Sequence, residues 1–378
     1  MVILDTTTAG VQKFRMVDPN IILNELYDYP IHIINSTNLQ ELQQFTDDKL
    51  FCHVSIVQND NLVKLISGLQ KNGVKIIVDV DDYWEVPISH YLYGYLKENN
   101  IVQKTLDFIK SANLITCTTK YLAKEIFKYN KNIAILPNSL NPAEGQLKLK
   151  NIPSDKIRIG WTGGASHLED IKLFRNLGVF TKLKNETVQF IMAGFDIRIR
   201  NQEGKIKENF DMSVWKKYEQ IITNDYTTIS QEYKKYLFQL DKHLMFHNEI
   251  YEPYRRVWTK PANKYMKIFN EIDIVLIPLI DSQFNRYKSE LKLIEAGFFR
   301  KPVVCSDVQQ YADVIQHGKS GFLIEEKKAH KDFTKYTKKL IHSPQLRTDL
   351  GNTLYEYCNE NFNLVKNSEK RLNVYEAV

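Results

Sequence analysis

The chain has 378 residues, of which 43% are hydrophobic and 25% are charged, so its composition is that of an ordinary globular protein. Its length favours two domains. The net charge of +6 comes from residues 151–378, which carry 36 basic and 29 acidic side chains, against 15 and 16 in residues 1–150. This excess suits an anionic ligand, but without a dense basic stripe it does not by itself indicate a DNA-binding protein.

The sequence also argues against secretion and against membrane insertion. The N-terminal stretch lacks a basic region followed by an apolar run, so we expect no signal peptide. No apolar run approaches the roughly 20 residues that span a bilayer. The four cysteines, Cys52, Cys117, Cys305 and Cys358, lie too far apart for a metal or redox motif. We therefore expect reduced, buried cysteines in a cytoplasmic protein.

In the first half of the chain, short β-branched runs alternate with helical segments, which is typical of a parallel sheet covered by helices on both faces. Helices are expected at 19–27 and 61–71. The predicted strands are 1–7, 31–36, 51–58, 74–82, 113–119 and 132–139.

The second half repeats this pattern, with predicted strands at 157–164, 188–194, 243–248, 272–279, 302–307 and 321–326. We therefore predict an α/β protein with two doubly wound Rossmann-like domains facing across a cleft. The first domain covers 1–148 and the second 149–345, while C-terminal helices at 346–378 pack back toward the first. A polar, aromatic-rich segment at about 200–245 is predicted to be a helical insertion. It is either an enlarged connection or a part that recognises an acceptor or partner.

A glycine pair follows the first strand of the second domain. Gly163 and Gly164 would let the backbone approach phosphate oxygens, and the helix that follows would favour an anion at its N-terminus. His167 would then donate to a phosphate. The alternatives are a tight turn at the glycines and an ordinary polar residue at His167.

The stretch FNRYKSELKLIEAG, residues 284–297, carries the strongest indication of a nucleotide site. It follows the buried strand at 272–279, and we expect a helix to begin near Lys288 and Ser289. Lys288 and nearby amides would converge on a pyrophosphate, with Lys292 one turn further on. Glu295 could accept both hydroxyls of a ribose. The alternative is a solvated helix face of mixed charge.

An acidic group ends the strand at 74–82. Asp79, Asp81 and Asp82 could bind Mg²⁺ or could orient acceptor hydroxyls, and we favour the reading without a metal. His90 and Asp82 are the residues of the first domain most suited to a catalytic role, although a helix cap or core position would equally explain His90.

Several of these motifs resemble retaining GT-B glycosyltransferases of family 4, the glycosyl transferases group 1. The match is FN-x-x-KS-x-LK-x-x-E-A at 284–296, followed by PVVCSD and then GKSGFLI. AGVQKFRMVDPN, IIVDVDDYWEVP, ANLITCTTKYLAKEI and IGWTGGASHLED resemble other parts of the family in the same order, so the likeness extends over most of the chain.

The resemblance implies a nucleotide-sugar donor, a UDP- or GDP-sugar, on the second domain and an acceptor mainly on the first. Glu295 would hold the ribose, and no tightly bound cofactor or metal is implied, because cations can stabilise the leaving diphosphate. The implied donor-binding residues are Gly163, Gly164, His167, Lys260, Lys288, Ser289, Glu290, Leu291 and Glu295. The implied acceptor-side residues are Gly10, Arg15, Asp79, Asp81 and Asp82. The residues expected to take part in catalysis are His90, Asp82, Lys288 and Lys292.

One position departs from the family pattern. The family often has an acid eight residues before the ribose glutamate, where this chain has Tyr287. The acceptor stays open between a cell-surface glycan, a lipid-linked sugar, a protein and hydroxymethylated pyrimidines in phage DNA. A catalytically degenerate nucleotide-sugar-binding module and a nucleotide-sugar epimerase are the alternative functions. The oligomeric state is also open.

Overall fold

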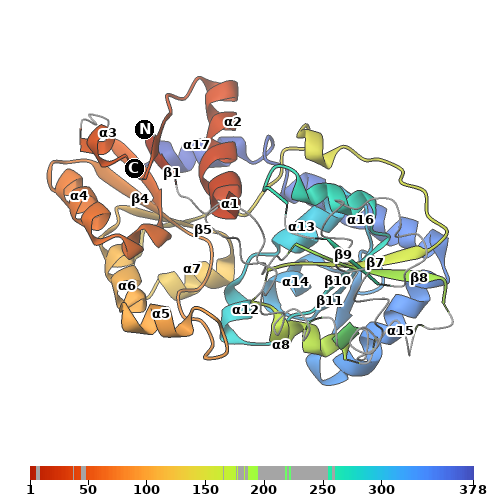
Figure 1. Ribbon diagram of the computed structural model, residues 1–378. Coiled ribbons are helices and arrows are strands. Elements are labelled where there is room, and N and C mark those ends of the chain that lie inside the picture. The colour runs from red at the N-terminus through yellow and green to blue at the C-terminus, as the bar shows by residue number, and fades with distance from the viewer. Residues whose placement is uncertain are drawn as a thin grey trace, which may run out of the picture. The chain divides into compact units, whose positions relative to one another are not determined.

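The computed structural model describes residues 1–5, 9–36, 38–43, 48–164, 166–175, 186–194, 254–257 and 260–378, together with Leu177, Leu183, Tyr218, Ile221 and Ile222. These residues form two compact units (Figure 1). The first consists of Met1–Glu144, Ser282–Ile294 and Cys358–Val378, and the second of Gly145–Asp281 and Glu295–Tyr357. The insertion expected at about 200–245 lies outside the described residues, apart from Tyr218, Ile221 and Ile222, and so does the strand expected at 243–248.

The first unit contains a six-stranded parallel sheet with the order β2-β1-β3-β4-β5-β6. Its strands are β1 (Val2–Asp5), β2 (His32–Asn35), β3 (Lys49–His53), β4 (Lys75–Val80), β5 (Leu114–Cys117) and β6 (Ile133–Ile135). Its helices are α1 (Ala9–Val11), the π-helical Gln12–Val17, α2 (Asp18–Tyr27), α3 (Leu39–Gln43), the 3₁₀ segment Val54–Gln58, α4 (Asp60–Lys71), α5 (Tyr93–Glu98), α6 (Ile101–Ser111), α7 (Lys120–Ile126), α12 (Gln283–Tyr287) and α17 (Ser368–Glu376).

Burial and capping explain why these segments form strands and helices. The central strands are apolar at nearly every position because helices cover both faces of the sheet. In α4, Leu62 and Ile66 lie on one face and are buried in the core. The side chain of Asn59 caps this helix by accepting hydrogen bonds from the amides of Asn61 and Leu62, both at 3.2 Å.

The end of the chain belongs to the core of the first unit. Helix α17 packs against α2, and the ring of Tyr375 lies 5.4 Å from that of Phe51. Lys49 on β3 donates to the carbonyl of Tyr375 at 2.7 Å. Figure 1 shows the two chain ends and α17 close to β1 in this unit.

The second unit contains another six-stranded parallel sheet, with the order β12-β11-β10-β7-β8-β9. Its strands are β7 (Ile157–Thr162), β8 (Val188–Ala193), β9 (Tyr254–Val257), β10 (Ile274–Ile277), β11 (Val303–Ser306) and β12 (Phe322–Ile324). Its helices are α8 (Leu168–Ile171), α13 (Leu291–Phe298), α14 (Gln309–Val314), α15 (Ala329–Ile341) and α16 (Pro344–Asn361), with 3₁₀ segments at Gly145–Leu147, Lys172–Phe174, Tyr265–Asn270 and Glu326–Lys328. Two of these helices are divided between the units. The first four residues of α13, up to Ile294, and the last four of α16, from Cys358, belong to the first unit.

A close contact explains one glycine of the second sheet. A Cβ atom at Gly160, in the middle of β7, would lie 2.4 Å from Cδ1 of Ile272, so only glycine allows this side chain to pack on the strand. All four cysteines are free and buried, as the sequence predicted. The two parallel sheets confirm the predicted α/β class. Within the described ranges, no helix combines the length and the apolar character needed to cross a bilayer.

Candidate functional site

A pocket opens in the second unit where three neighbouring strands end. Thr162, Ala193 and Val257, the last residues of β7, β8 and β9, line it together with the 3₁₀ segment Tyr265–Asn270. Its volume is about 540 Å³, within the range of small-molecule sites. In open parallel sheets, ligands bind beyond the carboxyl ends of the strands. The position and the size of the pocket therefore both fit a ligand site.

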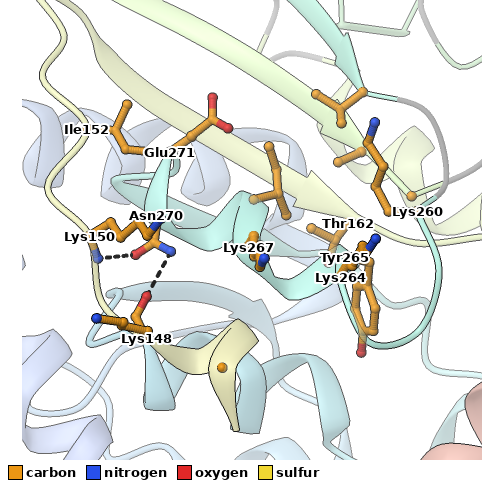
Figure 2. Close-up of a pocket in the computed structure, with 15 residues that line it drawn as sticks. Lys148, Lys150, Ile152, Thr162, Lys260, Lys264, Tyr265, Lys267, Asn270 and Glu271 are labelled. Carbon is orange, nitrogen blue, oxygen red and sulfur yellow. Dashed lines mark hydrogen bonds between the residues drawn. The ribbon is translucent and has the colours of Figure 1, made fainter. Parts of the chain in front are cut away.

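The charge of the pocket is strongly positive. Glu271, which also lines the pocket, is paired with Arg255 at 2.6 Å, so its charge is balanced from outside the lining. Five lysines lie in the lining: Lys148, Lys150, Lys260, Lys264 and Lys267. Figure 2 shows Lys260 and Lys264 at one end of the pocket and Lys148 and Lys150 at the other. Such a concentration of one charge repels itself when empty and favours an anionic ligand.

The wall nearest Lys148 and Lys150 is held by hydrogen bonds (Figure 2). The side chain of Asn270 accepts from the amide of Lys150 at 2.7 Å and donates to the carbonyl of Lys148 at 3.2 Å. Gln146 donates to the carbonyl of Ala262 at 3.1 Å. These contacts join the segment after Glu144 to the segment before β10, so the shape of the wall does not depend on a ligand.

The glycines at the strand ends lie against one another. Gly194 has a φ of +100°, a conformation that other residues rarely adopt, and a Cβ there would lie 3.1 Å from the amide nitrogen of Gly163. The amide of Gly163 donates to the carbonyl of Ala193 at 3.0 Å, so it extends the sheet. A Cβ at Gly164 would meet no atom within 4 Å. Neither of the two predicted glycines belongs to the pocket lining, whereas Gly194 does.

Glu295 is reached from the pocket through a tyrosine. Glu295 lies in α13 and is only 3% exposed. The hydroxyl of Tyr265, a lining residue, donates to Oε1 of Glu295. The carboxylate predicted to receive the ribose hydroxyls thus accepts a hydroxyl from the protein itself. Tyr265 was not predicted, because its only signal in the sequence is an aromatic residue shortly before a buried strand.

Of the remaining predicted donor residues, Lys260 lines the pocket, whereas His167 lies outside its lining. His167 is 7% exposed, its Nδ1 lies 2.7 Å from Oδ2 of Asp170, and its ring lies edge-on to Trp161 at 6.1 Å. The other oxygen of Asp170 accepts from the amide of Ile280 at 2.9 Å. His167 therefore braces the loop after β7 against the segment that follows β10.

The helix expected to begin near Lys288 and Ser289 starts two residues later, and a short helix that was not predicted precedes it. α12 ends at Tyr287 and α13 begins at Leu291, and Lys288 has an extended backbone with ψ of 152°. The predicted donor residues Lys288, Ser289, Glu290 and Leu291, together with Lys292, belong to the first unit, whereas Glu295 belongs to the second. Within the first unit, the side-chain amide of Asn138 donates to Ser289 Oγ at 2.7 Å, and Glu290 is buried.

In the first unit, Arg15 and Asp79 form a buried ion pair. Arg15 donates from Nε to Oδ2 of Asp79 at 2.9 Å and from Nη2 to Oδ1 at 2.7 Å. Arg15 also donates to the carbonyl of Leu136 at 2.7 Å, and Thr116 donates to Asp79 at 2.5 Å. Burial opposes the charge of Arg15, but Asp79 outweighs it and raises the pKa of the guanidinium. Arg15 and Asp79, two of the predicted acceptor-side residues, are thus enclosed in protein, which fits a structural role.

Asp81 is paired with a histidine that the sequence analysis missed. Nε2 of His53, at the end of β3, lies 2.8 Å from Oδ1 of Asp81, and its Nδ1 accepts from the amide of Ser55 at 3.2 Å. Burial disfavours the imidazolium, yet Asp81 outweighs it and raises the pKa of His53. Burial likewise opposes the charge of Asp81, but His53 lowers the pKa of Asp81. His53 ends the strand next to β4, and this was the available signal.

Two of the predicted catalytic residues, His90 and Lys288, contact the same ring in the first unit, and the charge of Lys288 also acts on a third, Asp82. The pKa of Asp82 is raised to about 6, because neighbouring protein atoms desolvate the carboxyl and Asp81 repels its charge, whereas Lys288 partly offsets the shift. Although its carboxyl is partly desolvated, the residue Asp82 taken as a whole is exposed to solvent. Burial and the charge of Lys288 lower the pKa of His90. The ring of Phe284 contacts both, with Lys288 Nζ at 4.5 Å and the His90 ring at 5.7 Å.

Tyr287, which stands where the family pattern often has an acid, contacts an acid instead. Its hydroxyl donates to Oε2 of Glu125 on α7 at 3.0 Å, and its ring lies 4.8 Å from that of Tyr83. Desolvation and this hydrogen bond raise the pKa of Tyr287. The tyrosine therefore holds the segment 282–294 on the first unit.

The remaining predicted residues show no comparable arrangement. Gly10 is exposed in α1, and a Cβ there would meet no atom within 4 Å. In the part of the chain that the structure describes, no three His, Cys, Asp or Glu side chains gather as a metal site would require. Asp79 and Asp81 each have a cationic partner already.

A known protein family matches the part of the chain that contains Glu295 and the pocket-lining residues from Val257 to Glu271. Residues 257–357 match the family model of glycosyl transferases group 1. No curated protein matches the chain at a significant level.

Several solved structures share the fold at low sequence identity. TarM of S. aureus is 15% identical with a TM-score of 0.56, over 89% of this chain, which spans 57% of the TarM chain. HepE of Anabaena, solved with UDP-glucose, is 12% identical with a TM-score of 0.57, over 94% of this chain and 88% of HepE. A glycosyltransferase of Rickettsia africae is 13% identical with a TM-score of 0.60, over 100% and 98%. These likenesses establish the GT-B fold.

Proposed function

We propose that the protein is a glycosyltransferase that moves a sugar from a nucleotide-diphosphate sugar to an acceptor hydroxyl. The observation that carries this proposal is the lysine-lined pocket at the carboxyl ends of β7, β8 and β9, together with the match of residues 257–357 to glycosyl transferases group 1. Its volume of about 540 Å³ accommodates a nucleotide, and its lysines balance a diphosphate.

In this proposal the nucleotide enters at the end of the pocket formed by Thr162, Lys260 and Tyr265. The ribose hydroxyls replace the hydroxyl of Tyr265 at the carboxylate of Glu295, which can accept two hydrogen bonds. Lys260 stabilises the negative charge that develops on the departing diphosphate. HepE, whose structure was solved with UDP-glucose, makes a uridine nucleotide the first donor to test, and guanosine nucleotides the second.

The acceptor side of the reaction is assigned to Asp82, His90 and Lys288 in the first unit. An ionised Asp82 can accept a hydrogen bond from the acceptor hydroxyl and orient it for attack. Retention of configuration follows from the resemblance to family 4, in which the leaving phosphate takes the acceptor proton. The anomeric configuration of the product, read by proton NMR against that of the donor, tests this part separately.

A thermal-shift and calorimetric panel of UDP, GDP and CDP sugars tests the donor site. We expect one nucleotide class to raise the melting temperature, because a ligand that binds only the folded state stabilises it. Lys260→Ala should weaken the binding of this nucleotide and should lower its dependence on salt. Lys331→Ala, at an exposed position of α15 outside the pocket lining, is the matched control. Equal nucleotide affinity in both variants would contradict the assignment of the pocket.

The alternative of a binding module without turnover is favoured by one observation, the engagement of Tyr287 with Glu125 at a position where the family often has an acid. Such a module would bind the nucleotide sugar and leave it intact. Release of free sugar from the donor in the absence of acceptor, followed by chromatography, would exclude it.

A further inference from the structure

An exposed apolar surface lies beside the acceptor-side residues of the first unit. We define it as Ile88, Tyr91, Leu92 and Tyr95, which are 80%, 72%, 36% and 44% exposed. Ile88, Tyr91 and Leu92 lie just before helix α5 (Tyr93–Glu98) and Tyr95 lies in it, and all four side chains face solvent. Helix α5, which carries Tyr95, contains no buried residue. A gathering of large apolar side chains in solvent indicates a binding surface.

Backbone hydrogen bonds around His90 hold this surface in place. The amide of His90 donates to the carbonyl of Pro87 at 2.8 Å, and the amide of Tyr93 donates to the carbonyl of His90 at 3.0 Å. The amide of Leu92 donates to Nδ1 of His90 at 3.2 Å. The surface is therefore largely preformed, which lowers the entropy lost on binding.

The surface is continuous with the acceptor-side residues. The ring of His90 stacks on that of Tyr91, with centroids 4.8 Å apart, and the charge of Lys288 acts on both His90 and Asp82. The ring of Phe284 contacts both His90 and Lys288, so a molecule bound on Tyr91 would lie next to His90 and close to Lys288. This is the position that an acceptor hydroxyl requires in the proposed reaction.

The chemistry of the surface favours a saccharide. A pyranose ring has an apolar face of C–H bonds and a rim of hydroxyls, whereas tyrosine combines an apolar ring face with a hydroxyl at its edge. We propose that Tyr91 and Tyr95 bind the sugar rings of a neutral oligosaccharide acceptor, with Ile88 and Leu92 covering the apolar edge of those rings. This inference rests on the proposed glycosyltransferase function and names the class of its acceptor.

The charge of the surrounding segment separates this acceptor from the anionic ones. Among the exposed residues of 79–98, the acids are Asp82, Glu85 and Glu98 and the single base is Lys97. Asp79 and Asp81 are paired with Arg15 and His53, and one further base, Lys288, acts on His90. Duplex DNA and anionic membranes need a basic surface, since their binding depends on pairing phosphates with lysine and arginine. A neutral glycan meets no such repulsion.

Binding of the full-length protein to an array of neutral oligosaccharides, sulfated oligosaccharides and duplex DNA tests the proposal, with phosphatidylglycerol vesicles tested by sedimentation. We expect binding to neutral oligosaccharides alone. The double variant Tyr91→Ala Tyr95→Ala should weaken this binding at least ~10-fold, because two stacking faces are removed. Phe127→Ala is the matched control, since Phe127 is another exposed aromatic residue of the first unit, at 52% exposure, outside the surface.

Nucleotide affinity, measured on the same samples, keeps this inference distinct from the proposed function. Loss of glycan binding with unchanged nucleotide affinity would support the acceptor surface. Preferential binding to DNA, sulfated oligosaccharides or vesicles, no binding to any neutral oligosaccharide, or unchanged glycan binding in the double variant would overturn it. Absence of nucleotide binding in the unaltered protein would instead contradict the proposed function.

Discussion

Replacing Arg15 by methionine tests whether the buried ion pair of the first unit is structural. Arg15 and Asp79 have side chains 1% and 0% exposed. The guanidinium donates two hydrogen bonds to Asp79, one to Leu136 and one at 3.3 Å to Asn138. In Arg15→Met, Asp79 keeps the hydrogen bond from Thr116 but loses its cation. Leaving one buried charge unpaired costs about 3–5 kcal/mol, so we expect a loss of stability of that size.

Urea denaturation with hydrogen exchange of β4 peptides as the readout measures this change within the first unit. The double variant Arg15→Met Asp79→Leu is the control, because replacing both charges by apolar side chains removes the unpaired carboxylate. It should be more stable than Arg15→Met alone. A loss below about 1 kcal/mol in the single variant would refute the structural reading of the pair. The reading would also be refuted if the stability lost in the double variant equalled the sum of the losses in Arg15→Met and Asp79→Leu.

The raised pKa of Asp82 predicts a pH dependence: if the ionised carboxyl orients the acceptor, transfer should fall as the pH drops through about 6, and Asp82→Asn should abolish this limb of the profile. Because the folded-state pKa lies above the ordinary value, ionisation of Asp82 opposes folding, so Asp82→Asn should unfold no more easily than the unaltered protein at pH 7.5. Lys288→Met should move the limb to higher pH, since Lys288 lowers the pKa of Asp82, and an unmoved limb would separate the two residues. Glu295→Ala should weaken nucleotide binding ~10- to 100-fold in calorimetry, as expected for lost hydrogen bonds to a charged group. Tyr265→Phe should leave nucleotide affinity equal or tighter, because it removes the hydroxyl that competes for Glu295.

The α/β class was predictable because strands buried on both faces are apolar at nearly every position. Such runs, as at 74–82 and 272–279, stand out from the helical periodicity around them. Strand β9 (Tyr254–Val257) was not predicted. Its sequence, YRRV, carries two arginines in a sheet edge, and Arg255 is tolerated there because it pairs with Glu271, a partner 16 residues away.

Helix α12, just before Lys288, was not predicted, and the reason is local. Ser282 caps α12 by accepting from the amide of Asn285 at 3.2 Å, so a separate short helix forms before Lys288. The extended backbone at Lys288 then ends it. The sequence SQFN looked like part of a loop, so only the second helix, α13, was expected.

The partners of the site residues could not be predicted from their spacing along the sequence. Arg15 and Asp79 lie 64 residues apart, and only the fold shows that they neutralise each other. His53 and Asp81 meet because β3 and β4 are neighbours, which a strand list does not specify. Lys260 was among the expected donor-binding residues and lines the pocket, whereas the other four lysines of the lining belong to no motif recognised in the sequence. The chemistry of single residues was readable, but their partners were set by the topology.

The most direct test of the account is a crystal structure of the protein soaked with UDP, or with GDP if the thermal-shift panel favours it. We expect the nucleotide in the pocket at the ends of β7, β8 and β9, with its ribose hydroxyls at Glu295 and its phosphates toward Lys260. Nucleotide density elsewhere in the second unit, or a Tyr265 hydroxyl still bonded to Glu295 in the nucleotide complex, would contradict it.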